Sequence, residues 1–281
     1  MRGAAPGIAA SLLALALVGC AAGPSRPARA GAMEATVEPA PAVTMPAPAS
    51  TPRPPDADLL ALPDAVPKTE PRARFGNPAF YEVYGQRYVV LPTAQGYVER
   101  GVASWYGPDF HGIRTSTGEP YDMYAMTAAH KTLPLPAYAR VTNLRNGRSI
   151  TVRINDRGPF KANRIIDLSY AAALKLDMVR DGTTLVEVQA LEPGDVPDAA
   201  PPRQPALYAQ VGAFGVEDNA LRLRDRLAGM GVGPLVVRTD SVAGRTLYRV
   251  RVGPIDSVAA YDSLVERLRA ADITGVTLAG P

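Results

Sequence analysis

The stretch that decides the fold runs from Gly101 to Ser169: GVASWYGPDFHGIRTSTGEPYDMYAMTAAHKTLPLPAYARVTNLRNGRSITVRINDRGPFKANRIIDLS. Its short apolar runs alternate with turns rich in glycine and proline, which is typical of a small β-domain. Catalysis and binding need ionisable groups that converge on a rigid frame. Nowhere else in the 281 residues are such groups so dense among turn residues, so we expect the functional site here. The groups are Glu119, Asp122, His130, Asp156 and Asp167.

Hydrophobic alternation divides this stretch into strands. Tyr138–Leu144 and Arg148–Asn155 alternate apolar and polar residues on either side of Asn146-Gly147, a dipeptide that favours the turn of a β-hairpin. Several short strands with few helices favour a small closed barrel. The other predicted elements are strands over 101–106 and 185–191 and a helix over 169–177, with Ser169 as its N-cap.

Five motifs in one order resemble the double-psi β-barrel domain of the rare lipoprotein A family, septal-ring lytic transglycosylases of the bacterial cell wall. The resemblance implies a six-stranded double-psi barrel, which we place at residues 101–192. The hydrophobic periodicity of the sequence does not by itself predict this topology. The motifs are ASWYG (103–107), TSTGEPYDM (115–123), TAAHKTLP (127–134), NDRGPF (155–160) and IDLS (166–169).

A second pattern begins after a linker that is rich in proline and acidic residues, placed at 193–204. Over residues 205–281 the order of predicted elements is βαββαβ, which matches a four-stranded sheet backed by two helices. YAQVGAF (208–214) and YRVRVGP (248–254) resemble the SPOR domain, a family that binds glycan strands stripped of their stem peptides. The predicted fold class is therefore mainly β for the barrel and α+β for the second domain.

The N-terminus predicts export. A charged residue, a short apolar run and small residues before Cys20 indicate a secretory signal over residues 1–19. Leu17-Val18-Gly19-Cys20 resembles the bacterial lipobox, whose cysteine carries acyl chains that anchor the mature chain to a membrane. Ala21 is not the aspartate of an inner-membrane retention signal, so we expect the outer membrane, facing the periplasm and enriched at the division site. An incidental thiol after a simple signal is the alternative.

Composition separates the remaining segments. Residues 20–68 are built largely of alanine, proline and threonine, and such a chain buries too little apolar surface to fold, so we predict a disordered tether. Residues 69–100 contain tyrosines and valines and predict an extended arm that packs on the barrel. Cys20 is the only cysteine, so no intrachain disulfide is expected.

Charge says little about partners. The formal net charge is +3 and the isoelectric point is near 9.0, without a basic block interleaved with aromatics, so no nucleic acid is expected. The two histidines have no metal-ligand spacing, and neither a metal nor a cofactor is predicted. The expected partners are peptide-free glycan strands of peptidoglycan, the membrane through lipid on Cys20, and septal-ring proteins.

The resemblance also implies a chemistry. A lytic transglycosylase needs an acid for the leaving oxygen, and the C6 hydroxyl of the same N-acetylmuramic acid attacks C1 without water. Three residues match the family's active-site motifs: Asp156 as acid and base, Glu119 as second carboxylate, and His130 as an orienting or sugar-binding group. Each has a plainer interpretation: a turn aspartate, a solvated glutamate and a structural histidine.

Further residues are candidates for holding the substrate. The barrel candidates are Trp105, Tyr106, Asp122, Asn155, Arg157 and Asp167, of which Asp167 could instead cap the following helix. In the second domain, alternation places Leu207, Ala209, Val211, Val250 and Val252 under the helices and leaves polar side chains on the open face. The glycan-binding candidates there are Tyr208, Gln210, Phe214, Arg249 and Arg251.

Two classes of function stay open. The first is an endolytic lytic transglycosylase that cleaves glycan strands lacking stem peptides during cell separation. The second is a non-catalytic wall-binding lipoprotein, since double-psi barrels also resemble expansins. The joint presence of Asp156, Glu119 and His130 favours the enzyme.

Overall fold

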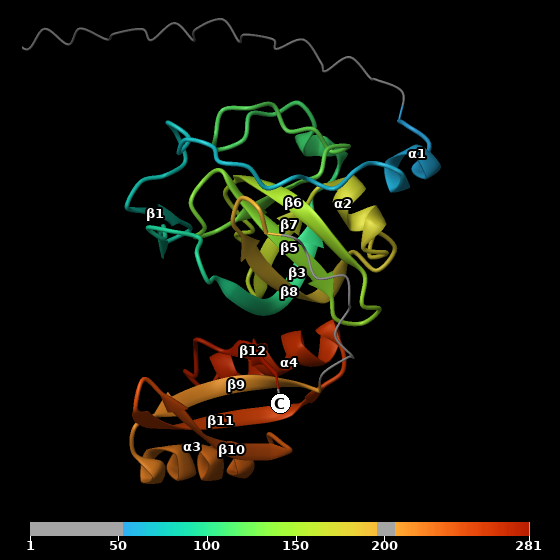
Figure 1. Ribbon diagram of the computed structural model, residues 1–281. Helices are drawn as coiled ribbons and strands as arrows, with labels where there is room; N and C mark the ends of the chain where they lie inside the picture. Colours follow the sequence, from blue (N-terminus) through green and yellow to red (C-terminus); the bar gives the residue numbers. More distant parts are fainter. Residues whose placement is uncertain (1–52, 196–205, 281) are drawn as a thin grey trace, which may run out of the picture. The chain divides into compact units, whose positions relative to one another are not determined.

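The computed structural model (Figure 1) describes residues 53–195 and 206–280. The expected signal segment, Cys20 and most of the second linker lie outside these residues. Within the described ranges, no helix is long and apolar enough to cross a membrane. The elements in chain order are α1 (Asp56–Leu60), β1 (Phe80–Val83), β2 (Gln86–Val89), β3 (Val98–Trp105), η1 (Pro108–Phe110), β4 (Thr127–His130), β5 (Ala137–Asn143), β6 (Ser149–Asp156), β7 (Arg164–Leu168), α2 (Tyr170–Lys175), β8 (Thr183–Leu191), β9 (Leu207–Phe214), α3 (Glu217–Gly229), β10 (Leu235–Val242), β11 (Arg245–Ile255), α4 (Val258–Arg269) and β12 (Thr277–Ala279).

Six strands, β3 to β8, form a closed ring. Their spatial order is β3–β7–β4–β6–β5–β8, and the pairing of β8 with β3 closes the sheet. The pairs β3–β7 and β4–β6 are parallel, and the other four pairs are antiparallel. The ring confirms the predicted six-stranded barrel. It also has no edge strand that could pair with another chain.

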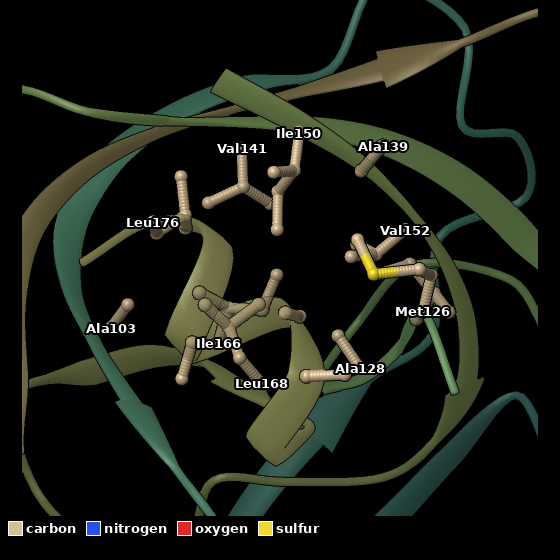
Figure 2. Packing of buried hydrophobic residues seen from close by; sticks show 14 of the residues in the cluster. Ala103, Met126, Ala128, Ala139, Val141, Ile150, Val152, Ile166, Leu168 and Leu176 are labelled. Carbon is tan, nitrogen blue, oxygen red and sulfur yellow. The ribbon is translucent and has the colours of Figure 1, made fainter. Parts of the chain in front are cut away.

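Small and branched apolar side chains fill the ring (Figure 2). Ala103, Ala128, Val152, Ile166 and Leu168 are fully buried and come from four different strands. Alternate residues of each strand supply them, because side chains alternate between the two faces of a strand. Each branched side chain that is fully buried contributes about 1.5–3 kcal/mol. The interior is thus packed, and a substrate site must lie on the outside of the wall.

Helix α2 follows the barrel strand β7 directly. The Ser169 hydroxyl accepts a hydrogen bond from the Ala172 backbone N–H at 3.2 Å, which confirms the predicted N-cap. The same hydroxyl donates to the Ala125 carbonyl at 2.6 Å, so the cap also fixes the chain before β4. The alanines of α2 are completely buried, because their small side chains allow a close approach to the barrel.

The disordered tether predicted over 20–68 is wrong in its last part, since the described residues 53–68 pack on the barrel. Leu59 of α1 is only 2% exposed and belongs to the barrel's core cluster. Lys175 of α2 forms an ion pair with Asp64. The proline content suggested a chain without a core, but the leucine run around Leu59 buries enough apolar surface to fix this segment.

The predicted arm over 69–100 packs on the barrel and contains a hairpin of its own, β1–β2. Asn77 holds the start of the hairpin by a two-way hydrogen bond with the Leu135 backbone, at 2.8 Å to the N–H and 2.7 Å to the carbonyl. The first barrel strand begins at Val98, three residues before the predicted boundary.

The C-terminal domain is a four-stranded antiparallel sheet in the order β10–β11–β9–β12, with helices α3 and α4 (Figure 1). Leu207, Ala209 and Val211 are buried and share a core with Leu227 of α3 and Leu268 of α4. The predicted βαββαβ order and the predicted inward face of β9 are both confirmed.

Candidate active site

Two of the predicted carboxylates face one cavity on the outside of the barrel wall. Asp156 ends β6 and Asp167 lies in β7, and both are register partners of Ala129 in the intervening strand β4. Their backbones are therefore two strand spacings apart, roughly 9–10 Å. The register shifts between Ala128 and Ala129, which brings Asp156 to the same face as Asp167. The sheet itself fixes the spacing of the pair.

The cavity has a volume of about 360 Å³. Ala129 lies between the two carboxylates at its floor, and a single methyl group there leaves the space between them open. Tyr106 and Tyr121 stack on each other at 4.2 Å between ring centroids and line one side. A cavity with aromatic walls and a few convergent polar groups is the usual form of a small-molecule or sugar site.

Three donors converge on one oxygen of Asp156. Its Oδ1 accepts hydrogen bonds from the Ser116 N–H, the Ser116 hydroxyl and the Arg157 N–H, each at 2.7 Å. Hydrogen bonds of this kind stabilise a negative charge. Asp156 is therefore held in place by the loop before β4.

Asp167 has a different environment. Burial raises its pKa, and the Ser104 hydroxyl, which donates to its Oδ1, and the charges of Lys131 and Arg164 act in the opposite direction. The charge of Asp156 adds a smaller upward contribution. A carboxyl group with a raised pKa keeps its proton to a higher pH. Ser169 caps α2, so Asp167 is not needed as a cap.

The Tyr106 hydroxyl is an unsatisfied donor next to this pair. The oxygen is buried and has no hydrogen-bond partner among the described residues. Burial raises the pKa of Tyr106, with smaller contributions from the charges of Asp156 and Asp167, so the phenol stays protonated. A bound hydroxyl or acetamido oxygen would satisfy this donor.

Glu119 does not line the cavity with Asp156. Its carboxylate accepts hydrogen bonds from Arg153 at 2.8 and 3.1 Å and from the Asn155 side chain at 3.1 Å. The Arg153 hydrogen bond lowers the pKa of Glu119, and the same guanidinium also binds Glu70 of the arm. Asp167, and not Glu119, is thus the carboxyl group that lines this cavity with Asp156, while Glu119 and Asn155 fasten the loop that carries Ser116.

His130 is a buried histidine that does not line the cavity, and its ring bonds backbone groups and a tyrosine instead of a carboxylate. It is 1% exposed. Its Nδ1 accepts from the backbone N–H groups of Thr132 and Leu133, at 3.2 and 3.0 Å, which places its proton on Nε2, 2.9 Å from the Tyr97 hydroxyl. Burial lowers its pKa to about 3, so it is neutral in the physiological range.

Arg157 lines the cavity, but its guanidinium is used inside the protein. It donates to the Gly76 carbonyl of the arm at 2.8 Å and to the carbonyls of His130 and Leu133 at 3.1 and 2.5 Å. Burial lowers its pKa to about 10, so it keeps its charge at neutral pH. Arg157, the residue after Asp156, therefore joins the end of β6 to the arm and to the β4–β5 loop.

The remaining barrel candidates lie away from the cavity. Trp105 packs edge-to-face on Tyr170 at 5.5 Å and contacts the core. Asp122 is largely exposed and accepts from the Tyr124 N–H at 2.9 Å in a local turn. Of the two neighbouring aromatic candidates Trp105 and Tyr106, only Tyr106 lines the cavity.

The sequence did not indicate several residues of this site, among them Ser104, Ser116, Tyr121 and Tyr84. Ser104 and Ser116 are short polar residues inside quoted motifs, and only the closed sheet shows that they contact Asp167 and Asp156. Tyr121 follows a proline in a loop and gave no signal. Tyr84 comes from the arm, where the dipeptide Tyr-Gly was the one available sign of a turn.

In the C-terminal domain, Gln210 and Arg249 meet on the open face of the sheet as predicted. Arg249 donates to the Gln210 side-chain oxygen at 3.0 Å and pairs with Asp240 at 2.6 Å. Arg251 is the register partner of Gln210 and so lies on the same face, but it is 8% exposed, because it is covered there and donates to the Gly280 carbonyl at 2.8 Å.

The other two candidates of this domain, Tyr208 and Phe214, lie in different surroundings. Tyr208 is half-buried and pairs with Ala279 in the register of β9 and β12. Phe214 packs against the core beneath the helices, with Leu223 of α3, so its side chain does not join the polar group on the open face.

Comparisons with known proteins agree with this architecture. A family model described as "Lytic transglycolase" matches residues 98–188, and a SPOR domain model matches residues 205–278. The chain is 37% identical over 284 residues to the "Endolytic peptidoglycan transglycosylase RlpA" of Pseudomonas aeruginosa (strain UCBPP-PA14), covering 80% of this chain and 83% of that protein. The protein of the same name from Neisseria meningitidis serogroup B is 43% identical over 195 residues, which are 69% of this chain and 80% of the relative. The crystal structure of the RlpA SPOR domain from Pseudomonas aeruginosa is 35% identical, covers 27% of this chain and 99% of that chain, and has a TM-score of 0.26.

The protonation of His130 gives a prediction that separates a structural from a catalytic histidine. Between about pH 6.5 and pH 3, His130 is protonated in the unfolded chain but neutral in the folded chain. The free energy of unfolding therefore falls as the pH falls through this range. His130→Gln should lower the free energy of unfolding at pH 7 and flatten its dependence on pH between 6.5 and 3. Urea denaturation at a series of pH values measures both. A variant with wild-type stability and wild-type pH dependence would contradict the structural role.

Proposed function

The chain belongs to the RlpA family of endolytic peptidoglycan transglycosylases, and we propose that it cleaves the glycan strands of peptidoglycan at the cavity between Asp156 and Asp167. The observation that carries this assignment is the contrast between the two carboxyl groups. Burial favours the protonated form of Asp167, whereas three hydrogen-bond donors stabilise the anion of Asp156. Glycosidic cleavage needs one group of each kind.

We assign the proton donor to Asp167. Its proton passes to the glycosidic oxygen as the bond from C1 of N-acetylmuramic acid breaks, and the Asp156 carboxylate stabilises the positive charge that develops on the ring. The C6 hydroxyl of the same residue then attacks C1 and gives its proton to Asp156. The products are a 1,6-anhydro end and a free 4-hydroxyl, no water is consumed, and exchange with solvent returns the proton from Asp156 to Asp167.

Glu119 and His130 act on this chemistry through position. Glu119 holds the loop of residues 115–119 against β6, and Ser116 of that loop is the residue that binds Asp156. His130 orders the turn after β4, to which Arg157 binds. Loss of either side chain would move the groups that hold Asp156, although neither exchanges a proton with the substrate.

The second domain would select the substrate. The open face of its sheet carries Tyr208, Gln210 and Arg249, with Arg238 as the register partner of Arg249. An amide can both donate to and accept from acetamido groups, and a guanidinium pairs with the lactyl carboxylate of a muramic acid whose stem peptide has been removed. Binding of such strands would concentrate the enzyme where the septal wall is being split.

Attachment to the outer membrane through lipid on Cys20 is the part of the proposal that rests on sequence alone. The apolar run before Cys20 and the small residues beside it support a lipoprotein signal. The segment between Cys20 and residue 53 would then tether the barrel to the membrane while the C-terminal domain binds the wall. Division-site proteins remain expected partners.

The catalytic assignment predicts the chemical form of the product and a large loss of activity in two variants. When the wild-type protein acts on peptide-free glycan, it should release fragments with 1,6-anhydro ends. Mass spectrometry identifies these ends, because each is one water lighter than a hydrolysed end. Asp167→Asn and Asp156→Asn should each lower kcat/KM by about a hundred- to ten-thousandfold, because each keeps its size but loses the titrating group. Activity of the wild type should decline as the pH rises through the raised pKa of Asp167, since the donor is then ionised.

Asp122→Asn is the matched control, because Asp122 lies in the same stretch but outside the cavity, and its kcat/KM should stay within about twofold. Full activity of Asp167→Asn would move the donor role to another group. Binding of glycan without any anhydro product from the wild type would favour the expansin-like alternative.

The substrate-selecting role predicts a binding loss in the C-terminal domain. Gln210→Ala combined with Arg249→Ala should weaken binding of the full chain to peptide-free glycan by about tenfold or more, since two polar contacts are lost. Arg222→Ala, on α3, serves as control and should bind as the wild type does. Sedimentation with insoluble glycan measures the bound fraction, and equal binding by all three proteins would sink the assignment of this face.

The lipid anchor predicts a change of location. Cys20→Ala removes the acylated residue, so the protein should leave the outer-membrane fraction and appear in the soluble periplasmic fraction. Fractionation followed by immunoblotting shows the distribution. An unchanged membrane fraction would refute the lipoprotein assignment.

A further inference from the structure

The hairpin β1–β2 places a tyrosine at the rim of the catalytic cavity. Val83 pairs with Gln86, so Tyr84 and Gly85 form a two-residue turn. Tyr84 is 93% exposed, yet its side chain lines the cavity that contains Asp156 and Asp167. The hairpin lies before residue 98 and is therefore outside the part of the chain that the lytic transglycosylase family model matches.

The backbone at Tyr84 is strained for so large a residue. Tyr84 has a φ of 51° and Gly85 a φ of 74°, the geometry of a turn in which asparagine, aspartate or glycine is favoured at both positions. A bulky side chain at positive φ is an outlier, and such strain tends to gather at functional sites. Because the exposed ring of Tyr84 contributes little to packing, the fold does not explain why the position is a tyrosine.

The hairpin is nevertheless held firmly beside the carboxylates. Tyr81 and Tyr88 stack on each other at 5.3 Å, and both contact Phe160, at 6.1 and 5.7 Å between ring centroids. The Tyr81 hydroxyl donates to the Lys131 carbonyl at 2.8 Å. Phe160 lies four residues after Asp156, so the aromatic cluster of Tyr81, Tyr88 and Phe160 fixes the hairpin to the strand end that carries a catalytic group.

Exposed apolar side chains also occupy the loop that follows β3. Phe110 is 53% exposed and Ile113 is 55% exposed, and both line the same cavity as Tyr84. Arg114 lines it as well, with one guanidinium nitrogen bound to the Gly118 carbonyl at 2.7 Å. The rim therefore combines apolar surfaces from two separate segments with a cation, above a floor that carries two carboxyl groups.

This combination matches an acidic amino sugar in a polymer. One face of a pyranose ring presents C–H groups that pack on an aromatic ring, whose face carries partial negative charge. A lactyl carboxylate would pair with a guanidinium. Exposed apolar rims of this kind mark binding sites on soluble proteins. When one sugar of a glycan strand occupies the cavity, the next sugar along the strand must lie over the rim.

We propose that the β1–β2 hairpin forms a sugar-binding subsite of the barrel, in which Tyr84 packs against a pyranose ring of the glycan next to the bond that is cleaved. The proposal rests on the proposed function, because it assumes that a glycan occupies the cavity. It adds the hairpin, a segment outside the matched barrel domain, to the substrate-binding surface.

The test uses Tyr84→Asn in the full chain, because asparagine relaxes the turn and removes only the ring. We expect an unchanged or higher melting temperature, since asparagine is favoured at this φ. For soluble peptide-free tetrasaccharides of N-acetylglucosamine and N-acetylmuramic acid, we expect KM to rise about five- to tenfold with little change in kcat. This rise corresponds to the loss of one aromatic contact with the sugar. Calorimetric titration in the Asp156→Asn background should show the same factor in Kd.

Tyr84→Trp keeps an aromatic face and should retain wild-type KM and Kd. Val89→Ala, on the same hairpin and away from the cavity, should also bind as the wild type does. Values of KM and Kd within twofold of wild type for Tyr84→Asn would overturn the subsite while leaving the enzyme intact. A wild type that binds the tetrasaccharide without cleaving it would contradict the proposed function, and the Kd comparison would still decide the subsite. A wild type that neither binds nor cleaves would overturn both.

Discussion

The closure of the six-stranded sheet is the constraint on which the site depends. Closure places β4 between β6 and β7, and the parallel pairing of β4 with β6 brings Asp156 level with Ala129, which is also the partner of Asp167. The separation of the two carboxyl groups is thus set by strand spacing, which side-chain motion changes little. A packed apolar interior keeps the strands in this register (Figure 2).

Two arginines next to the site bind the surrounding loops and the arm to the sheet. Arg153 binds Glu119 on one side and Glu70 of the arm on the other, while Arg157 binds carbonyls of the arm and of the β4–β5 loop. Both guanidiniums are partly buried, and removal of one partner from such a pair leaves a charge that is poorly solvated. The arm therefore belongs to the active-site support, and it also carries the tyrosine at the rim.

The sequence was informative where a pattern is local. Alternation and the cap at Ser169 predicted strands and a helix that the structure contains, and the motifs predicted that Asp156 and Asp167 belong to one site. The sequence was uninformative where the answer depends on distant partners. Burial of His130 and the pairing of Glu119 with Arg153 follow from the closed barrel, and Arg251 is covered where it contacts the Gly280 carbonyl. Leu59 was missed because the prolines around it outweighed a short leucine run.

The proposed mechanism depends on a raised pKa of Asp167, which keeps its proton to a higher pH than an ordinary aspartate does. Carbon-13 labelling of aspartate side chains allows their titration to be followed by NMR in the full chain, with Asp167→Asn and Asp156→Asn to assign the two signals. We expect the signal that is lost in Asp167→Asn to titrate above the ordinary range of an aspartate. In the Asp156→Asn variant its titration should move to lower pH, since a neighbouring negative charge is removed. Titration of that signal at or below the ordinary range in the wild type would contradict the proposed mechanism.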